Sequence, residues 1–158
     1  MKKFLGMFCL VVILLSNSVY AKDDSKMTLI NEAKKETGEI SPKELKEIFE
    51  KEEEVIILDV RELEQRAEGY IYDDFVPVKT VSITRGNLEW EVIDNIENKN
   101  ILVITYCRNG GRGALAAQTL KKMGYKNVKN LKGGIQDWAK AGYSIKTGLG
   151  VMALTAKE

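Results

Sequence analysis

Two short runs of branched aliphatic residues, at positions 55–58 and 101–104, constrain the fold of this chain more than any other feature. Neither run alternates polar with apolar residues, which is the pattern of strands buried on both faces of a sheet. Residues 78–83 and 127–131 form two further candidate strands. Segments with helical spacing lie between them, so we expect parallel pairing through right-handed crossovers. The sequence therefore predicts an α/β fold with a central, mostly parallel sheet covered by helices on both faces.

The helices between these strands have recognisable starts and ends. Residues 41–44 (Ser-Pro-Lys-Glu) combine an N-cap serine, a proline at the first helical position and a capping-box glutamate. A helix is also expected after the glycine-rich segment that follows position 104, and Gly124 lies where that helix should end. Apolar spacing predicts two more helices, at residues 88–96 and 135–140.

Length and composition favour one globular domain. The chain has 158 residues, of which 44% are hydrophobic and 30% charged, values that suit a folded rather than a disordered protein. We place the domain at residues 40–146, preceded by a polar arm at 22–39 and followed by a tail at 147–158. The formal charge of +1 gives no reason to expect nucleic acid or an anionic membrane as a partner.

The first 21 residues have the features of a secretory signal. Lys2 and Lys3 precede an apolar run at positions 4–15, and Ala21 ends a segment suited to signal peptidase. The run is shorter than the roughly 20 apolar residues that a membrane-spanning helix needs. We therefore expect cleavage after Ala21 rather than an anchor, which predicts a periplasmic or secreted protein.

The chain contains two cysteines and no histidine. The absence of histidine excludes Cys–His dyads, Ser–His–Asp triads and imidazole metal ligands. Cleavage of the signal would remove Cys9 and leave Cys107 alone, as a candidate reactive thiol. The alternative is a buried cysteine that acts as a small hydrophobic residue. No metal, nucleotide or flavin motif is present, and we expect no cofactor.

Cys107 opens a segment suited to binding an anion, Cys107-Arg108-Asn109-Gly110-Gly111-Arg112-Gly113. Its glycines permit backbone conformations that turn several N–H groups toward one point. The segment leads into a helix N-terminus, whose free N–H groups and positive dipole end also attract anions. Arg108 and Arg112 add positive charge. Together these features favour the thiolate form of Cys107 and an anionic substrate, whereas a plain strand-to-helix turn is the alternative.

This segment resembles the active-site loop of the rhodanese family, in which a cysteine opens a six-residue loop. Four other segments resemble motifs of the same family, in the same order along the chain. They are residues 57–61 (Ile-Leu-Asp-Val-Arg), 68–71 (Glu-Gly-Tyr-Ile), 82–89 (Ser-Ile-Thr-Arg-Gly-Asn-Leu-Glu) and 131–138 (Leu-Lys-Gly-Gly-Ile-Gln-Asp-Trp). The resemblance covers residues 40–146 and implies a rhodanese-like three-layer fold.

The resemblance implies a sulfurtransferase of the thiosulfate sulfurtransferase type. Cys107 would attack the sulfane sulfur of thiosulfate or a persulfide, and cyanide or a thiol would then accept the sulfur from a Cys107 persulfide. Asp59, Arg61 and Arg85 would lie near the site, although Asp59 as a cap and Arg61 as an ion-pair partner of Glu68 are structural alternatives. The expected substrate-binding residues of the loop are Arg108, Asn109, Gly110, Gly111, Arg112 and Gly113.

The sequence departs from the family pattern around the expected mouth of the site. Tyr70 stands where the family often has histidine, and Thr84 where it often has proline. Residues 72–80 form a longer and more acidic connection than usual. These differences leave the cysteine loop intact, so they concern the identity of the substrate rather than the chemistry.

Two other functions stay open at this stage. A phosphatase or arsenate reductase needs Cys-x5-Arg, whereas the spacing here is Cys-x4-Arg and Gly113 takes the place of that arginine. A sulfur carrier that delivers persulfide sulfur to a partner protein would keep the same fold and loop. The expected partners are a small anionic sulfur donor, a thiol or cyanide acceptor and, for a carrier, a protein acceptor.

Overall fold

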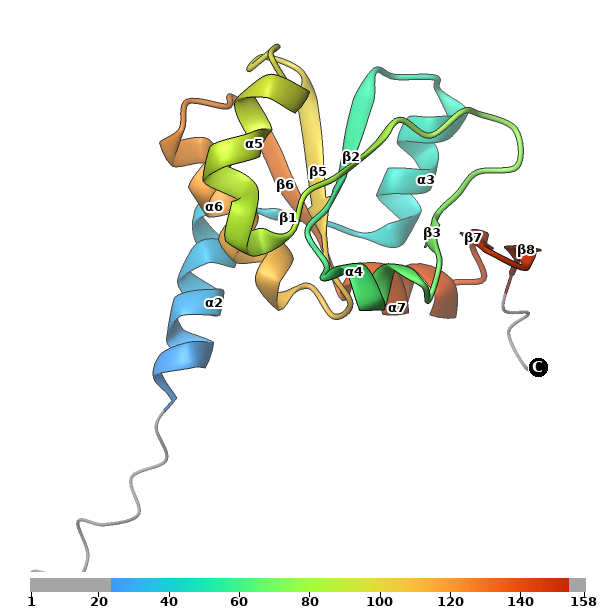
Figure 1. Cartoon of the computed structure of the whole chain (residues 1–158), viewed down its shortest axis with the longest axis horizontal. Helices are drawn as coiled ribbons and strands as arrows, with labels where there is room; N and C mark the ends of the chain where they lie inside the picture. The colour runs from blue at the N-terminus through green and yellow to red at the C-terminus, as the bar shows by residue number, and fades with distance from the viewer. Residues whose placement is uncertain (1–23, 154–158) are drawn as a thin grey trace, which may run out of the picture.

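A computed structural model describes residues 24–153. Five parallel strands form the central sheet in the order β1-β6-β5-β2-β4 (Figure 1). Their bounds are Glu39–Ile40 for β1, Val55–Asp59 for β2, Thr80–Ser82 for β4, Leu102–Tyr106 for β5 and Asn127–Leu131 for β6. The predicted signal segment and its Cys9 lie outside the described residues, as do residues 154–158.

Helices cover both faces of this sheet (Figure 1). One face carries α5 (Leu88–Asn95) and α6 (Gly111–Lys122), and the other carries α3 (Pro42–Glu50) and α7 (Gly134–Lys140). Alternate strand residues supply the two cores, because successive side chains of a strand point to opposite faces. The predicted α/β fold, with a parallel sheet between two helical layers, is confirmed.

The start of α3 shows how strictly local sequence determines a helix end. The Ser41 hydroxyl oxygen accepts a hydrogen bond from the Glu44 N–H at 3.2 Å, and the Glu44 carboxylate accepts one from the Ser41 N–H at 2.8 Å. These contacts with the Ser41 side chain and backbone lower the pKa of Glu44. The capping box predicted at residues 41–44 is therefore formed.

The segment expected as a polar arm is mostly helical. Helix α2 (Ser25–Thr37) packs against α6, with Ala33 and Thr37 buried. The side chains of Gln118 and Lys121 on α6 donate hydrogen bonds to Glu36, at 2.6 and 2.9 Å. The buried positions of α2 are small or polar, and such residues give a weak hydrophobic signal, which is why the sequence pattern indicated a polar arm here and not a helix of this length.

The remaining elements lie mainly at the edges of the domain. A separate antiparallel sheet joins β3 (Tyr70–Ile71), β7 (Ile145–Thr147) and β8 (Gly150–Met152). Two short helices are α4 (Leu63–Arg66) and the 3₁₀ helix η2 (Arg85–Asn87). Within residues 24–153, no helix is long and apolar enough to cross a membrane.

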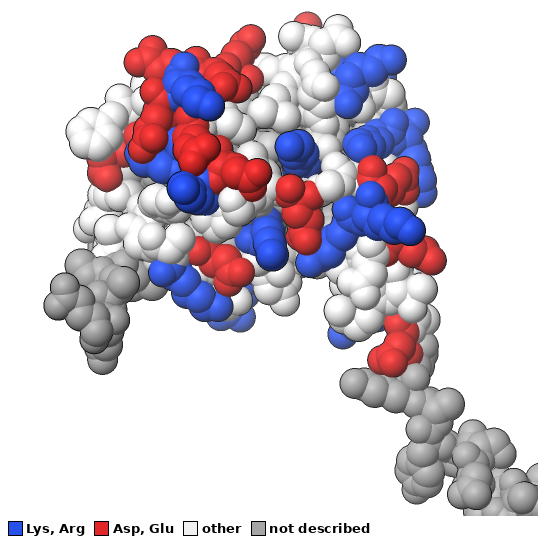
Figure 2. All heavy atoms as spheres, turned by 180° about the vertical axis from the view of Figure 1, so that it is seen from behind, with Lys and Arg blue, Asp and Glu red and all other residues white. Residues whose placement is uncertain are grey.

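Charged side chains of both signs are intermixed on the face that Figure 2 shows, with acidic side chains densest at its upper left. This distribution fits the small formal charge of the whole chain. On this face, no field of a single sign extends over the surface. On this face, attraction for a charged ligand therefore depends on local groups.

Candidate active site

The cysteine loop lies at the carboxyl edge of the parallel sheet. Strand β5 ends at Tyr106, Cys107 follows directly, and α6 begins at Gly111. Helices α4 and α7 lie at the same edge, in the lower part of Figure 1. Ligand and active sites of α/β sheets form at this edge, because the loops that follow the strands meet there. The sequence placed Cys107 at this edge, and the structure does the same.

The Cys107 side chain is free and buried, with its sulfur 3.8 Å from Asn109 Oδ1. Gly110 has a φ of +88°, a conformation that L side chains rarely adopt. A Cβ atom at Gly110 would also approach the carbonyl oxygen of Leu131 at 3.3 Å and the nitrogen of Gly133 at 3.2 Å. The loop is thus closed tightly against the turn between β6 and α7, and glycine at position 110 permits this.

The N-terminus of α7 fixes the carbonyl groups of the loop. The Ile135 N–H donates to the Cys107 oxygen at 3.0 Å, and the Gln136 N–H donates to the Arg108 oxygen at 3.1 Å. Gly134 has a φ of +61°, and a Cβ atom there would collide with the Cys107 carbonyl oxygen. The Gly-Gly turn therefore allows α7 to approach the loop this closely.

The N–H groups of the loop are available to a ligand. Among the described residues, no acceptor binds the backbone N–H groups of Arg108, Asn109 and Gly110. The N–H of Gly111 is 3.5 Å from Asn109 Oδ1, at the limit of a hydrogen bond. The carbonyls of Cys107 and Arg108 are bound to α7, while these donors of the loop stay free, and free N–H groups of such a loop can hold an anionic atom.

Both loop arginines contact one segment, residues 62–68, which includes α4. Arg108 Nε lies 3.4 Å from a carboxylate oxygen of Glu68. Arg112 pairs with Glu62 at 3.5 Å and also donates to the side chain of Gln65. These carboxylates offset part of the positive charge that the sequence led us to expect around Cys107.

Position 113 leaves no room for a side chain. A Cβ atom at Gly113 would collide with the Asn130 side chain and lie 3.3 Å from the Cα atom of Tyr106. The Gly113 carbonyl accepts a hydrogen bond from Thr105 Oγ1 at 2.8 Å, which holds the first turn of α6 against β5. An arginine of the kind that phosphatases carry at this position would not fit here.

Asp59 and Arg61 form a buried ion pair with each other. Arg61 Nη2 lies 2.7 Å from Asp59 Oδ2, and both side chains are fully buried. Arg61 also donates to the carbonyl oxygens of Gln65 and Gly69, at 3.0 and 2.6 Å. The partner of Arg61 is thus Asp59 and not Glu68, and the pair ties β2 to the segment that borders the loop.

Tyr106, the residue directly before Cys107, contacts this ion pair. Its hydroxyl donates to Asp59 Oδ2 at 2.9 Å. Burial, together with the negative charge of Asp59, raises the pKa of Tyr106 well above its ordinary value. Tyr106 therefore stays protonated and keeps donating to Asp59, which supports the backbone next to the cysteine.

Arg85 makes its polar side-chain contacts with two helices. Its guanidinium pairs with Glu89 at 3.1 Å and donates to Thr119 Oγ1 at 2.9 Å. Thr119 lies about two turns along α6 from the loop, given 3.6 residues per turn. These contacts connect η2 with α5 and α6.

Sequence reasoning missed several residues of the segment that contacts the loop, among them Arg66 on α4. The Nε and Nη2 atoms of Arg66 are buried and have no hydrogen-bond partner. Glu62, Gln65 and Glu68 were also missed as partners of the loop arginines. Only their closeness to the Asp-Val-Arg motif could have indicated a role.

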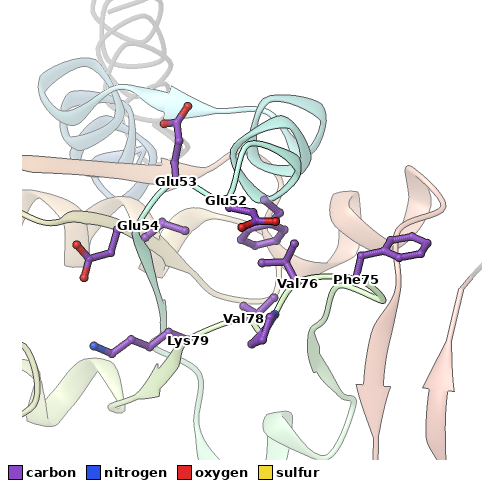
Figure 3. Close-up of a pocket in the computed structure, with 10 residues that line it drawn as sticks. Glu52, Glu53, Glu54, Phe75, Val76, Val78 and Lys79 are labelled. Carbon is purple, nitrogen blue, oxygen red and sulfur yellow. The ribbon is translucent and has the colours of Figure 1, made fainter.

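The pocket in Figure 3 lies at the opposite edge of the sheet from Cys107. It has a volume of about 350 Å³, and its lining includes Phe49, Val76, Val78 and the first residue of β2, Val55. The amino ends of parallel strands lie on the far side from the loops that follow the carboxyl ends. This pocket is therefore separate from the cysteine site.

Comparison with known families identifies the domain. The model of the rhodanese-like domain matches residues 41–141. The chain belongs to the rhodanese-like domain family. The match includes the cysteine loop, α4 and the Gly-Gly turn before α7, whereas α2 lies outside it.

Two relatives of this rhodanese-like chain have names that refer to sulfur transfer. The sulfurtransferase of Allochromatium vinosum is 32% identical over 109 residues, which is 68% of this chain and 94% of that protein. The Bacillus subtilis protein named "Putative sulfur carrier protein YrkF" is 36% identical over 100 residues, which is 63% of this chain and half of that protein. These relatives support a function of the sulfurtransferase type.

A solved structure shows the fold independently. The thiosulfate sulfurtransferase of Pseudomonas aeruginosa superimposes with a TM-score of 0.67 at 22% identity. The superposition covers 83% of this chain and 25% of that one. At this identity the likeness concerns the fold, and it confirms the rhodanese-like architecture.

Proposed function

We propose that this protein moves sulfane sulfur from thiosulfate or a persulfide donor to cyanide or a thiol, through a persulfide on Cys107. The observation that carries the proposal is the loop geometry. Hydrogen bonds from α7 fix the carbonyl groups of Cys107 and Arg108, and the N–H groups of Arg108, Asn109 and Gly110 have no acceptor within the described residues. Such a loop suits the partly anionic terminal sulfur of a persulfide.

The proposed reaction proceeds in two displacement steps. The Cys107 thiolate attacks the sulfane sulfur of the donor, a new S–S bond forms, and the donor S–S bond breaks. Sulfite, or a thiolate from a persulfide donor, leaves with the electron pair of that bond. The acceptor then attacks the terminal sulfur, and Cys107 leaves as thiolate. This is covalent catalysis by one nucleophile, and no cofactor takes part.

A sulfur carrier for a protein partner is the second candidate. The name of the Bacillus subtilis relative, a sulfur carrier protein, favours it. A carrier and an enzyme of this family would share the same loop, so the loop geometry fits both functions. In a carrier, the Cys107 persulfide would form as above and pass its sulfur to a protein thiol much faster than to cyanide.

We also propose that the protein acts outside the cytoplasm. The basic start and short apolar run of residues 1–21 support this location. Expression of the full chain in a bacterial host, followed by N-terminal sequencing of the periplasmic fraction, tests the proposal. A mature chain that begins at Lys22 is expected, and a full-length chain in the cytoplasm would contradict it.

Steady-state formation of thiocyanate from thiosulfate and cyanide tests the proposed chemistry. Ping-pong transfer predicts parallel double-reciprocal lines when the two substrates are varied. Cys107→Ser should abolish turnover, whereas Cys9→Ser, at the other cysteine of the chain, should not change it. Intersecting lines, or activity that survives Cys107→Ser, would contradict transfer through a Cys107 persulfide.

A further inference from the structure

We propose that Arg66 binds the oxyanion group of the sulfur donor, the sulfonate of thiosulfate in the first place. This assignment rests on the proposed function and makes Arg66 a residue that determines donor specificity. It starts from one observation on α4: the Nε and Nη2 atoms of Arg66 are buried and have no hydrogen-bond partner within the described residues.

An unpaired buried guanidinium edge is costly. A buried donor without an acceptor destabilises a fold by about 1–3 kcal/mol, and by more when the group is charged. The other four arginines of the chain have carboxylate partners, in the pairs Arg61–Asp59, Arg85–Glu89, Arg108–Glu68 and Arg112–Glu62. Within residues 24–153, Arg66 has no carboxylate partner. Because its unpaired buried donors destabilise the fold, their presence indicates a hydrogen-bond partner that comes from outside the chain.

Arg66 belongs to the segment that contacts the cysteine loop. Gln65, one residue earlier, contacts Arg112, and Glu68, two residues later, contacts Arg108. Residues 62–68 therefore run along the loop from one of its arginines to the other. Arg66 lies between the two points of contact.

The two unpaired nitrogens suit an oxyanion. Nε–H and Nη2–H lie on the same edge of the planar guanidinium and form a fork that donates two parallel hydrogen bonds to a sulfonate or carboxylate. Glu68 and Glu62 offset the charges of Arg108 and Arg112. Arg66, on the segment that contacts the loop, has no carboxylate partner among the described residues, so its charge is left for a ligand.

This role fits the direction in which charge moves during the first step. When the sulfane sulfur passes to Cys107, the donor S–S bond breaks and sulfite leaves with the electron pair. A fixed guanidinium on the sulfonate oxygens would hold thiosulfate in place and stabilise the departing sulfite. A persulfide donor without an oxyanion would gain nothing from this contact.

Two variants and two donors test the assignment. Arg66→Met keeps the length of the apolar stem and removes the charge, whereas Arg66→Lys keeps the charge and removes the fork. Persulfide formation on Cys107 is measured against thiosulfate and against the persulfide of N-acetylcysteinamide, which carries no oxyanion. Lys140→Gln, on the exposed side of α7, is the control for the loss of a positive charge.

The readout is the half-saturating concentration of thiosulfate divided by that of the amide persulfide. We expect Arg66→Met to raise this ratio about tenfold, equivalent to about 1.4 kcal/mol, and Arg66→Lys to raise it less. Lys140→Gln should not change it. The melting temperature of Arg66→Met should equal or exceed that of the wild type, because the variant removes unpaired buried donors.

The outcomes separate this inference from the proposed function. If the wild type forms a persulfide and Arg66→Met shows the same ratio, the oxyanion site is refuted while sulfur transfer stands. A lower melting temperature together with an unchanged ratio would assign Arg66 to the scaffold. If neither donor loads the wild type, the proposed function itself is refuted.

Discussion

The Cys107 carbonyl oxygen accepts a hydrogen bond from the Ile135 N–H, 3.0 Å away, and this bond attaches the cysteine loop to α7. The next pair, Gln136 and Arg108, repeats the contact at 3.1 Å. The loop between β5 and α6 is thus held by hydrogen bonds from a third element, α7. Because its carbonyls are fixed in this way, its N–H groups can face an anionic sulfur.

The first prediction concerns the glycine that permits this contact. Gly134→Ala should disrupt the loop, because the residue has a positive φ and its new methyl group would collide with the Cys107 carbonyl. We expect a loss of about 2–4 kcal/mol in the free energy of unfolding and little persulfide formation. Gly148→Ala, where a Cβ atom would meet nothing within 4 Å, is the control. If Gly134→Ala forms the Cys107 persulfide to the same extent as the wild type, α7 does not position the loop.

The second prediction tests whether Asp59 acts through the fold. Asp59→Asn removes the charge opposite the buried Arg61 and should cost about 3–5 kcal/mol in urea unfolding. The double variant Asp59→Leu/Arg61→Met should recover part of this loss, since no unpaired charge remains. Glu89→Gln, which breaks the partly exposed pair with Arg85, should cost less than about 1 kcal/mol.

Activity measurements distinguish a scaffold role for Asp59 from a role in substrate binding. Below its unfolding temperature, Asp59→Asn should retain most of its sulfur transfer per folded molecule. A large drop in transfer at an unchanged unfolding midpoint would instead assign Asp59 to substrate binding.

The strands were predictable because their signals are local and strong. Residues 55–58 and 101–104 are unbroken apolar runs, and they became the central pair β2 and β5. The capping box at Ser41 and Glu44 depends on residues three apart and was equally predictable. The cysteine loop belongs to the same class, since its glycines and the helix after it are adjacent in sequence.

The contacts of the arginines depended on tertiary structure and could not be predicted. Glu68 was the partner of Arg61 that the sequence offered, whereas the geometry at the end of β2 selects Asp59, two residues away. Arg66 carries no pattern that distinguishes it from an exposed helix residue. Only the tertiary structure shows that two of its nitrogens are buried without partners. Likewise, Ala33 of α2 is too small to indicate from sequence that it packs against α6.

The third prediction follows from the pKa of Asp73. Burial acts to raise this pKa, but the hydrogen bond from Lys46 and those from the N–H groups of Phe75 and Val76 outweigh it, so the pKa is lowered. A carboxyl whose pKa is lower in the folded state stabilises the fold above its unfolded pKa of about 3.9. This stabilisation is lost as the pH falls through the folded pKa.

Asp73→Asn should therefore be less stable than the wild type at pH 7, by about 2 kcal/mol. The difference in free energy of unfolding between the wild type and Asp73→Asn should decrease as the pH is lowered below about 4. Urea unfolding at a series of pH values measures it, with the exposed Asp94→Asn as the control for charge. If this difference in free energy of unfolding is the same in acid and at neutral pH, the stabilisation by Asp73 does not come from its carboxylate charge.

The most direct test of sulfur transfer is the intact mass of the reduced protein before and after incubation with thiosulfate. We predict a gain of one sulfur atom in the wild type, no gain in Cys107→Ser, and the return of the original mass with release of thiocyanate when cyanide is added. If thiosulfate, cysteine persulfide and polysulfide all leave the wild-type mass unchanged, Cys107 does not carry sulfur and the proposed function is wrong.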